Sequence, residues 1–372
     1  MTMDGDPAAV NGMGNDGCAA APASRTVHLG PENGSAELVL PVGLQSSDVD
    51  AICELTCWCM QSMCGVAEAF NVPLPRLEIW MLDLTESLAA LAPRVKGPPV
   101  IPGDVERMGG QLAGKTMPLE EDWSKAALAS PGVMLASDDG REKALAMFNL
   151  LHEVGHTVIE RLGVLSGVRE TGWHPTNHSR RKAENAVRHG LDEWRVSSLA
   201  WGLLRSVIRT QEGQDVTALD LFGAGYRVGL RGVLERVYPG WPDAVQRYRV
   251  HQLSLEDMYA QIVGETVEVF TILSHVEAES VMLERVTPLR DEYATHPATR
   301  LYLGEPWRAL IDCDAPLLAP LPDFAEAEGV YLSDVAPKVI DMWRRLGVTF
   351  TDGPGRWDLR IDVGEPLWDV SA

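Results

Sequence analysis

Residues 148–159 read FNLLHEVGHTVI and carry two histidines four positions apart, His152 and His156. Residues with this separation lie almost one above the other on an α-helix, so both imidazoles project from one face if the stretch is helical. Glu153 follows the first histidine directly and lies beside that face. The stretch therefore brings two nitrogen donors and one carboxylate together through local geometry alone.

The flanking sequence favours a helix around this stretch. Residues 137–140, SDDG, offer an N-cap, no proline follows until well past the histidines, and Gly163 offers a C-terminal stop. More than half of the predicted helix surface is apolar, which is typical of a buried helix. The apolar residues are Leu145, Phe148, Leu151, Val158, Ile159 and Leu162.

Burial favours a metal ion between the two histidines. A buried His, Glu and His within five residues would carry a desolvation cost of several kcal/mol without a partner, and one metal ion is the simplest partner for all three. Gly155 costs the helix interior about 1 kcal/mol relative to alanine, which predicts that another element approaches closely there. The alternative is a pair of core histidines with other partners and an exposed Glu153.

The pattern H-E-x-x-H is the layout of a zinc hydrolase helix. A catalytic zinc ion has three protein ligands and an open position for water, and Glu153 would be the general base that accepts a proton from that water. An H-E-x-x-H-x-x-G-x-x-H extension is excluded by Ile159 and Leu162, and no cysteine lies between Cys64 and Cys313 to act as third ligand. The remaining arrangement uses an acidic residue further along the chain. The candidates are Glu160, Glu170, Glu184, Asp192 and Glu193.

Residues 191–196, LDEWRV, resemble the D-E-aromatic element that supplies the zinc-binding glutamate in gluzincin-type and ImmA/IrrE-like metallopeptidase domains. Residues 131–136, PGVMLA, followed by the histidine-bearing helix, are similar to the short edge strand and motif helix of these families, and 70–83 resembles their opening helix-to-strand passage. The resemblance spans about 51–204. The chain lacks the pattern E-A-N-x-F-A that usually follows the glutamate in these families. Residues 182–187, KAENAV, match this pattern only in part.

The resemblance implies an α+β fold: a zincin-like domain with a small mixed or antiparallel sheet and a zinc ion held by His152, His156 and a glutamate. We favour Glu193 as this third ligand because small residues on its helix face allow close packing, and Glu184 is the reserve. The implied function is intracellular zinc-dependent hydrolysis of a peptide bond in a protein or peptide substrate, with Glu153 as the base. Two alternatives remain: a metallopeptidase-like regulatory or protein-binding module without turnover, and a zinc amidase that acts on a small molecule.

Peptide hydrolysis also needs a hydrogen-bond donor for the tetrahedral oxyanion. The candidate donors are His174, His178, His189, Tyr226 and Tyr259. His174 and His178 stand between the two ligand-bearing helices, where a group that faces the substrate is expected, although either one also fits a solvated loop position. The sequence does not choose among the five.

Composition divides the chain into three expected parts. Residues 1–35 are small and polar and predict a disordered tail, residues 36–210 hold the metallopeptidase domain, and residues 211–372 form a mainly helical C-terminal region. On a helix that opens at 254–257, His275 and Glu279 are expected to form a surface pair. The other expected elements are strands at 36–42, 77–82 and 131–136, helices at 48–70 and 179–209, a long loop at 93–123 and a last helix that ends at Gly347.

The charge balance excludes some classes of partner. The 372-residue chain has a formal net charge of -21, which argues against non-specific binding of nucleic acid. No apolar run approaches the length of a transmembrane helix, so no membrane partner is expected. The first residues, MTMDGD, lack the basic-then-apolar order of a signal peptide. We therefore expect a cytoplasmic protein.

Overall fold

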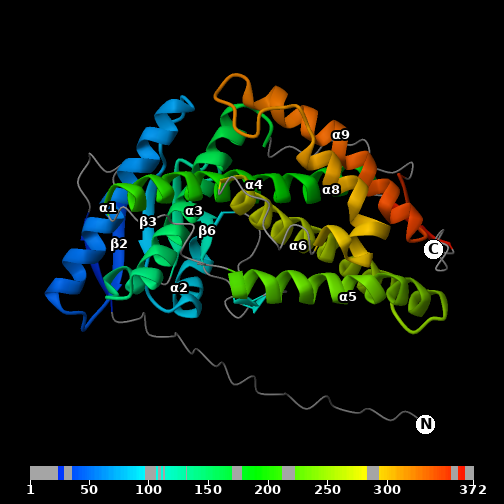
Figure 1. Ribbon diagram of the computed structural model, residues 1–372, viewed down its shortest axis with the longest axis horizontal. Coiled ribbons are helices and arrows are strands. Elements are labelled where there is room, and N and C mark those ends of the chain that lie inside the picture. The colour runs from blue at the N-terminus through cyan, green and yellow to red at the C-terminus, as the bar shows by residue number, and fades with distance from the viewer. Residues whose placement is uncertain are drawn as a thin grey trace, which may run out of the picture.

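Figure 1 shows the computed structural model of the chain, in which helices predominate and a small mixed sheet lies at one end. The expected α+β class is therefore confirmed. None of the helices in the described ranges has the length and apolarity that a membrane crossing needs. The structure describes residues 24–28, 36–96, 106–107, 110–111, 114–130, 132–169, 178–211, 223–282, 293–352 and 359–364.

The sheet has five strands in the order β1-β2-β3-β7-β6. Its three central strands run parallel, and β1 and β6 pair antiparallel at the two edges. Successive residues of a strand face opposite sides, so Leu77 and Ile79 enter the main core while Trp80 packs against a smaller cluster under α2. The strands are β1 (Ser24–His28), β2 (Ala36–Pro41), β3 (Arg76–Trp80), β6 (Lys115–Pro118) and β7 (Lys125–Ala129).

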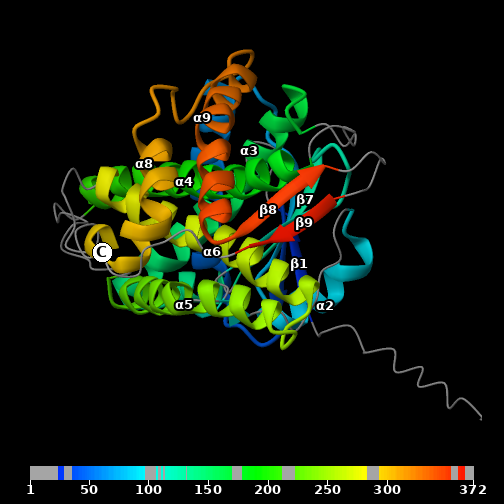
Figure 2. The same cartoon turned by 90° about the vertical axis from the view of Figure 1, so that its right-hand side faces the viewer.

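Helix α4 crosses the middle of the molecule and packs against α3, α6 and α9 (Figure 1). Figure 2 shows the hairpin of β8 (Val348–Asp352) and β9 (Leu359–Val363), which follows α9. A second short hairpin pairs β4 (Glu106–Arg107) with β5 (Gly110–Gln111). The helices are α1 (Ser46–Ala69), α2 (Leu84–Leu91), α3 (Gly140–Leu165), α4 (His178–Gln211), α5 (Gly223–Arg249), α6 (Leu255–Met282), α8 (Gly304–Ile311) and α9 (Phe324–Arg345), with single turns at Ala92–Arg94, Gly132–Ala136 and Thr299–Leu303.

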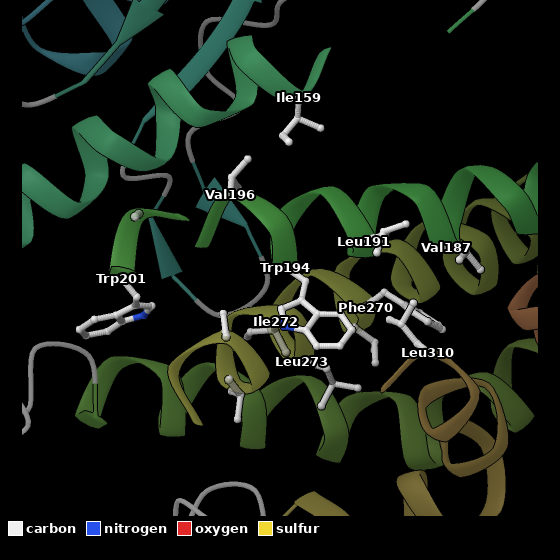
Figure 3. Packing of buried hydrophobic residues seen from close by; sticks show 14 of the residues in the cluster. Ile159, Val187, Leu191, Trp194, Val196, Trp201, Phe270, Ile272, Leu273 and Leu310 are labelled. Carbon is white, nitrogen blue, oxygen red and sulfur yellow. The ribbon is translucent and has the colours of Figure 1, made fainter. Parts of the chain in front are cut away.

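One hydrophobic core runs from the sheet through the helices to α9. Where α4 meets α6, Trp194 lies beside Ile272 and Leu273, and Figure 3 shows these side chains packed between the helices. The core contains residues from both sides of position 210, so the predicted metallopeptidase domain and the C-terminal region share their buried surface.

Two glycines allow the helices to approach closely. A Cβ at Gly155 of α3 would lie 3.3 Å from the Val196 Cβ of α4, which confirms the close approach predicted there. A Cβ at Gly190 of α4 would lie 2.8 Å from the Phe270 Cβ of α6, closer than real side chains pack. The crossing of α4 with α6 therefore depends on the absence of a side chain at Gly190, and its crossing with α3 is tight at Gly155.

Most of the expected elements are confirmed. The predicted strands at 36–42 and 77–82 are β2 and β3, and the predicted helices at 48–70 and 179–209 are α1 and α4. The predicted N-caps also hold, because the Asp139 side chain accepts a hydrogen bond from the Arg141 N–H at the start of α3. At the start of α6 the Ser254 hydroxyl oxygen accepts one from the Asp257 N–H.

The predicted edge strand at 131–136 is wrong. Residues Gly132–Ala136 form a 3-10 turn, and the strand lies earlier, as β7. The true edge strand, β6, falls inside the predicted loop at 93–123. Strand β7 reads KAALA, and alanine has little β propensity, so its pairing with β3 and β6 decides its conformation rather than its own residues.

Two boundaries also differ. Gly163 does not end α3, which continues to Leu165, because Gly163 does not adopt the left-handed backbone conformation of a helix end. The turn comes at Gly167, whose φ of 77° is in the left-handed region. Ser24–His28 lies in the predicted disordered tail but pairs with β2 as strand β1.

The crossing of α4 and α6 gives a test of the packing. Gly190→Ala should lower the free energy of unfolding by about 2 kcal/mol, since its Cβ must displace Phe270 or the helix. Gly264→Ala in α6 is the matched control, because a Cβ there meets nothing within 4 Å. This control should raise the free energy of unfolding by about 0.5–1 kcal/mol through helix propensity. Urea unfolding measures both, and equal effects would contradict the tight crossing.

Candidate metal centre

Two helices bring three ligand atoms together. Helix α3 presents His152 and His156, whose Nε2 atoms lie 3.1 Å apart. Glu193 Oε2, from α4, lies 3.3 Å from the Nε2 of His152 and 3.7 Å from the Nε2 of His156. Of the described residues, these three form the group of His, Cys, Asp or Glu side chains that could hold a metal ion. The predicted ligand set is therefore assembled in space.

The spacing of the three atoms suits one small ion. Bonds of about 2.0–2.1 Å to nitrogen and carboxylate oxygen place the ligands of a tetrahedral zinc site about 3.3–3.4 Å apart. The observed separations of 3.1, 3.3 and 3.7 Å bracket this value. Two imidazoles and one carboxylate also suit other divalent transition metals, so the geometry fits zinc without selecting it.

The electrostatics of His156 and Glu193 favour a positive charge beside the Glu193 carboxylate. Burial lowers the pKa of His156, but the Glu193 carboxylate outweighs burial and raises that pKa to about 9. Burial raises the pKa of Glu193, and the neighbouring His156 and His152 hold it well below its ordinary value. At neutral pH His156 therefore carries a proton beside the Glu193 carboxylate, in the place where a metal cation would bind.

Glu153 is buried between α3 and the edge strand β6. The Thr116 hydroxyl lies 2.6 Å from Glu153 Oε2 and 2.8 Å from the Glu153 carbonyl oxygen. A Cβ at Gly114 would lie 2.8 Å from Glu153 Oε1, so a larger residue at this position would displace the carboxylate. The negative charge of Glu153 contributes to the raised pKa of His156, which places the predicted base close to the predicted ligands.

His275 does not lie in a surface pair, contrary to the prediction. Its ring is largely buried, its Nε2 lies 3.6 Å from Glu193 Oε2, and its Nδ1 lies 2.8 Å from the Ser197 hydroxyl. Glu279 is buried as well. Burial lowers the pKa of His275 to about 4. The sequence did carry a signal for this burial: His275 lies three residues after Ile272 and therefore borders the apolar stripe of the helix.

The other candidate ligands lie elsewhere. Glu184, the reserve, pairs with Arg180 of its own helix at 2.7 Å. Asp192 pairs with Arg169, and Glu160 lies 3.5 Å from the same guanidinium. Glu170 lies outside the described residues. Glu193 is thus the carboxylate that the described structure brings to the two histidines.

The candidate oxyanion donors divide in the same way. His189 lies one turn before Glu193 on α4, with its Nε2 3.7 Å from Glu193 Oε1, so it borders the centre from the more exposed side. Tyr259 packs against the Phe350 ring, with the Lys182 ammonium 5.8 Å from its own ring centroid. His174 and the side chains of His178 and Tyr226 lie outside the part of the chain that the structure describes.

A buried network of charges fixes the orientation of α4 behind Glu193. Arg195 and Glu328 of α9 are both fully buried and lie 2.8 Å apart. Arg195 also lies 3.2 Å from Asp192, and Arg188 lies 2.7 Å from Glu328. Rotation of α4 would separate these pairs and leave buried charges without a partner, which is costly. The network therefore resists rotation of α4. It was missed in the sequence because its partners come from distant segments.

Comparisons with protein-family models, with curated proteins and with solved structures found no match for this chain.

The proton on His156 gives a test of the centre. Zinc binding at pH 7 should release about one proton, because His156 holds a proton up to a pH of about 9 in the metal-free protein. Zinc affinity should accordingly fall about tenfold for each pH unit below 9. Calorimetric titration in buffers of different ionisation enthalpy measures the release. Binding heats that do not depend on the buffer would contradict a proton held by this cluster.

Proposed function

We propose that this chain is a zinc-dependent peptidase built on a zincin-like domain, with His152, His156 and Glu193 as the metal ligands and Glu153 as the general base. The observation that carries the proposal is the meeting of these three ligand atoms, from two helices, at tetrahedral spacing. A buried carboxylate follows the first ligand in the chain. A structural zinc site would need four protein ligands and no base.

Zinc bound at this centre would supply a water nucleophile at neutral pH and polarise a carbonyl group. Glu153 would accept a proton from the attacking water and pass it to the nitrogen of the leaving amine. Thr116 holds Oε2 of this carboxylate at 2.6 Å, and Gly114 leaves the space beside Oε1 free of a side chain. The arrangement restrains one oxygen of Glu153 and leaves the other for proton transfer.

A protein or peptide is the proposed substrate. Strand β6 carries Thr116 and forms an edge of the sheet, with β7 as its partner on one side. An edge strand offers backbone N–H and C=O groups to an extended peptide, directly beside the Glu153 carboxylate. The buried base favours this reading over a binding module without turnover, which has no use for a carboxylate held in this way.

Substitutions distinguish the role of the proposed base, Glu153, from that of the proposed metal ligands. Purified wild-type protein should contain about one zinc per chain, and His152→Ala should lose it. Glu153→Gln should keep the zinc and lower peptide cleavage by about 100-fold or more. Metal analysis and mass spectrometry of a peptide library incubated with each variant provide the measurements.

Glu184→Gln is the control for Glu153→Gln and should keep both zinc and cleavage, because Glu184 pairs with Arg180 of its own helix rather than with the proposed ligands. If Glu153→Gln cleaves peptides as fast as wild type, hydrolysis by this base is wrong. If wild-type protein binds zinc but cleaves nothing in the library, a small-molecule amide or a binding role replaces the proposal.

The third ligand has its own test. Glu193→Gln should lower zinc affinity by more than about 100-fold, since it removes a metal ligand itself and not a residue that hydrogen-bonds to a ligand. Glu184→Gln should leave the affinity unchanged. Competition with a chelator measures both constants. The opposite order would move the ligand to Glu184 and contradict the distances in the structure.

A further inference from the structure

The Ser197 hydroxyl joins two histidines from different helices. Ser197 is buried on α4, one turn after Glu193. Its Oγ lies 3.4 Å from the Nδ1 of His152 on α3 and 2.8 Å from the Nδ1 of His275 on α6. The opposite nitrogens, both Nε2, lie 3.3 and 3.6 Å from Glu193 Oε2. Ser197 Oγ therefore lies near the Nδ1 atoms of both rings, and Glu193 Oε2 lies near their Nε2 atoms.

A hydroxyl group has a single proton, so it can donate a hydrogen bond to only one of its two nitrogen partners. Ser197 can donate to one Nδ1 and accept from the other. A histidine that binds a metal through Nε2 carries its own proton on Nδ1. When His152 is a ligand, its Nδ1–H therefore donates to Ser197 Oγ, and the Ser197 proton goes to the Nδ1 of His275.

This chain of hydrogen bonds decides the tautomer of His275. When Nδ1 of His275 accepts the Ser197 proton in this way, the ring's own proton must be on Nε2, the nitrogen 3.6 Å from Glu193 Oε2. A protonated Nε2 has no lone pair for a metal. No proton is gained or lost overall: each neutral ring keeps one N–H and the serine keeps its O–H.

We propose that Ser197 transmits the tautomer of metal-bound His152 to His275, so that His275 presents an Nε2–H at the metal centre and donates it to a carbonyl or oxyanion oxygen of the bound substrate. The inference rests on the proposed peptidase function and names its oxygen-binding donor. It assigns Ser197 as a positioning residue. None of the five donors expected from the sequence is involved.

The tautomer is directly measurable. Zinc-loaded protein labelled with 15N-histidine should show His275 protonated at Nε2 and unprotonated at Nδ1 in long-range nitrogen–proton correlation spectra. The signals are assigned by their loss in His275→Gln. In Ser197→Ala the His275 signals should change toward a mixture of tautomers. Ser206→Ala, whose hydroxyl donates to the Leu203 carbonyl on the exposed part of α4, is the matched control and should leave them unchanged.

Zinc affinity distinguishes a donor from a ligand. In His275→Ala the affinity should stay within about threefold of wild type, whereas Ser197→Ala should weaken it by about 10-fold through loss of the outer partner of His152. A loss of about 100-fold or more in His275→Ala would make His275 a ligand and overturn the donor role, while leaving the metal centre intact. Absence of zinc binding in wild type would instead remove the proposed function itself.

Turnover completes the test. With zinc bound, His275→Ala should lower kcat/KM for a cleaved peptide by about 100- to 1000-fold, the range for removal of one oxyanion donor. His275→Gln keeps an N–H at a similar reach and should restore part of this loss. Zinc-loaded His275→Ala protein with wild-type turnover, or a His275 protonated at Nδ1 in the loaded wild type, would overturn the inference.

Discussion

The close approach of α3 and α4 at Gly155 is the constraint on which the centre depends. Gly155 stands directly before His156, and the space where its Cβ would lie is bounded by Val196 of α4 at 3.3 Å. Val196 lies three residues after Glu193 and directly before Ser197. The same crossing therefore brings Glu193 to the Nε2 atoms of His152 and His156, and Ser197 to the Nδ1 atom of His152. A wider separation of these two helices would lengthen the distances from Glu193 to both histidines and from Ser197 to His152.

Rotation of α4 is controlled from its other side. Asp192 and Arg195 flank Glu193 and Trp194 in the sequence and face the buried charges of Arg169 and Glu328. Ion pairs in a buried network depend strongly on geometry, because each charge left without its partner carries a large desolvation cost. Helix α9 thereby contributes to a centre that it does not enter. Trp194 packs near Ile272 and Leu273 of α6, as Figure 3 shows.

The C-terminal half of the chain supplies part of the centre as well as support. Helix α6 packs along α4 and carries His275 to the Glu193 carboxylate. Gly190 makes this contact close, since α6 fills the place of its Cβ with Phe270. The helices beyond position 210 are therefore not a separate attachment in the described structure: they share the core and contribute a ring to the cluster.

The sequence by itself determined the local parts of the centre. The helical period places His152 and His156 on one face, and the caps and apolar residues of α3 could be read with their approximate limits, because each depends on neighbours within a few positions. The tertiary structure decided which carboxylate reaches the histidines, that His275 is buried beside them, and that β6 rather than 131–136 is the edge strand at Glu153. Those features depend on how distant elements pack, and the helical and strand periods of one segment carry no information about the partner that covers it.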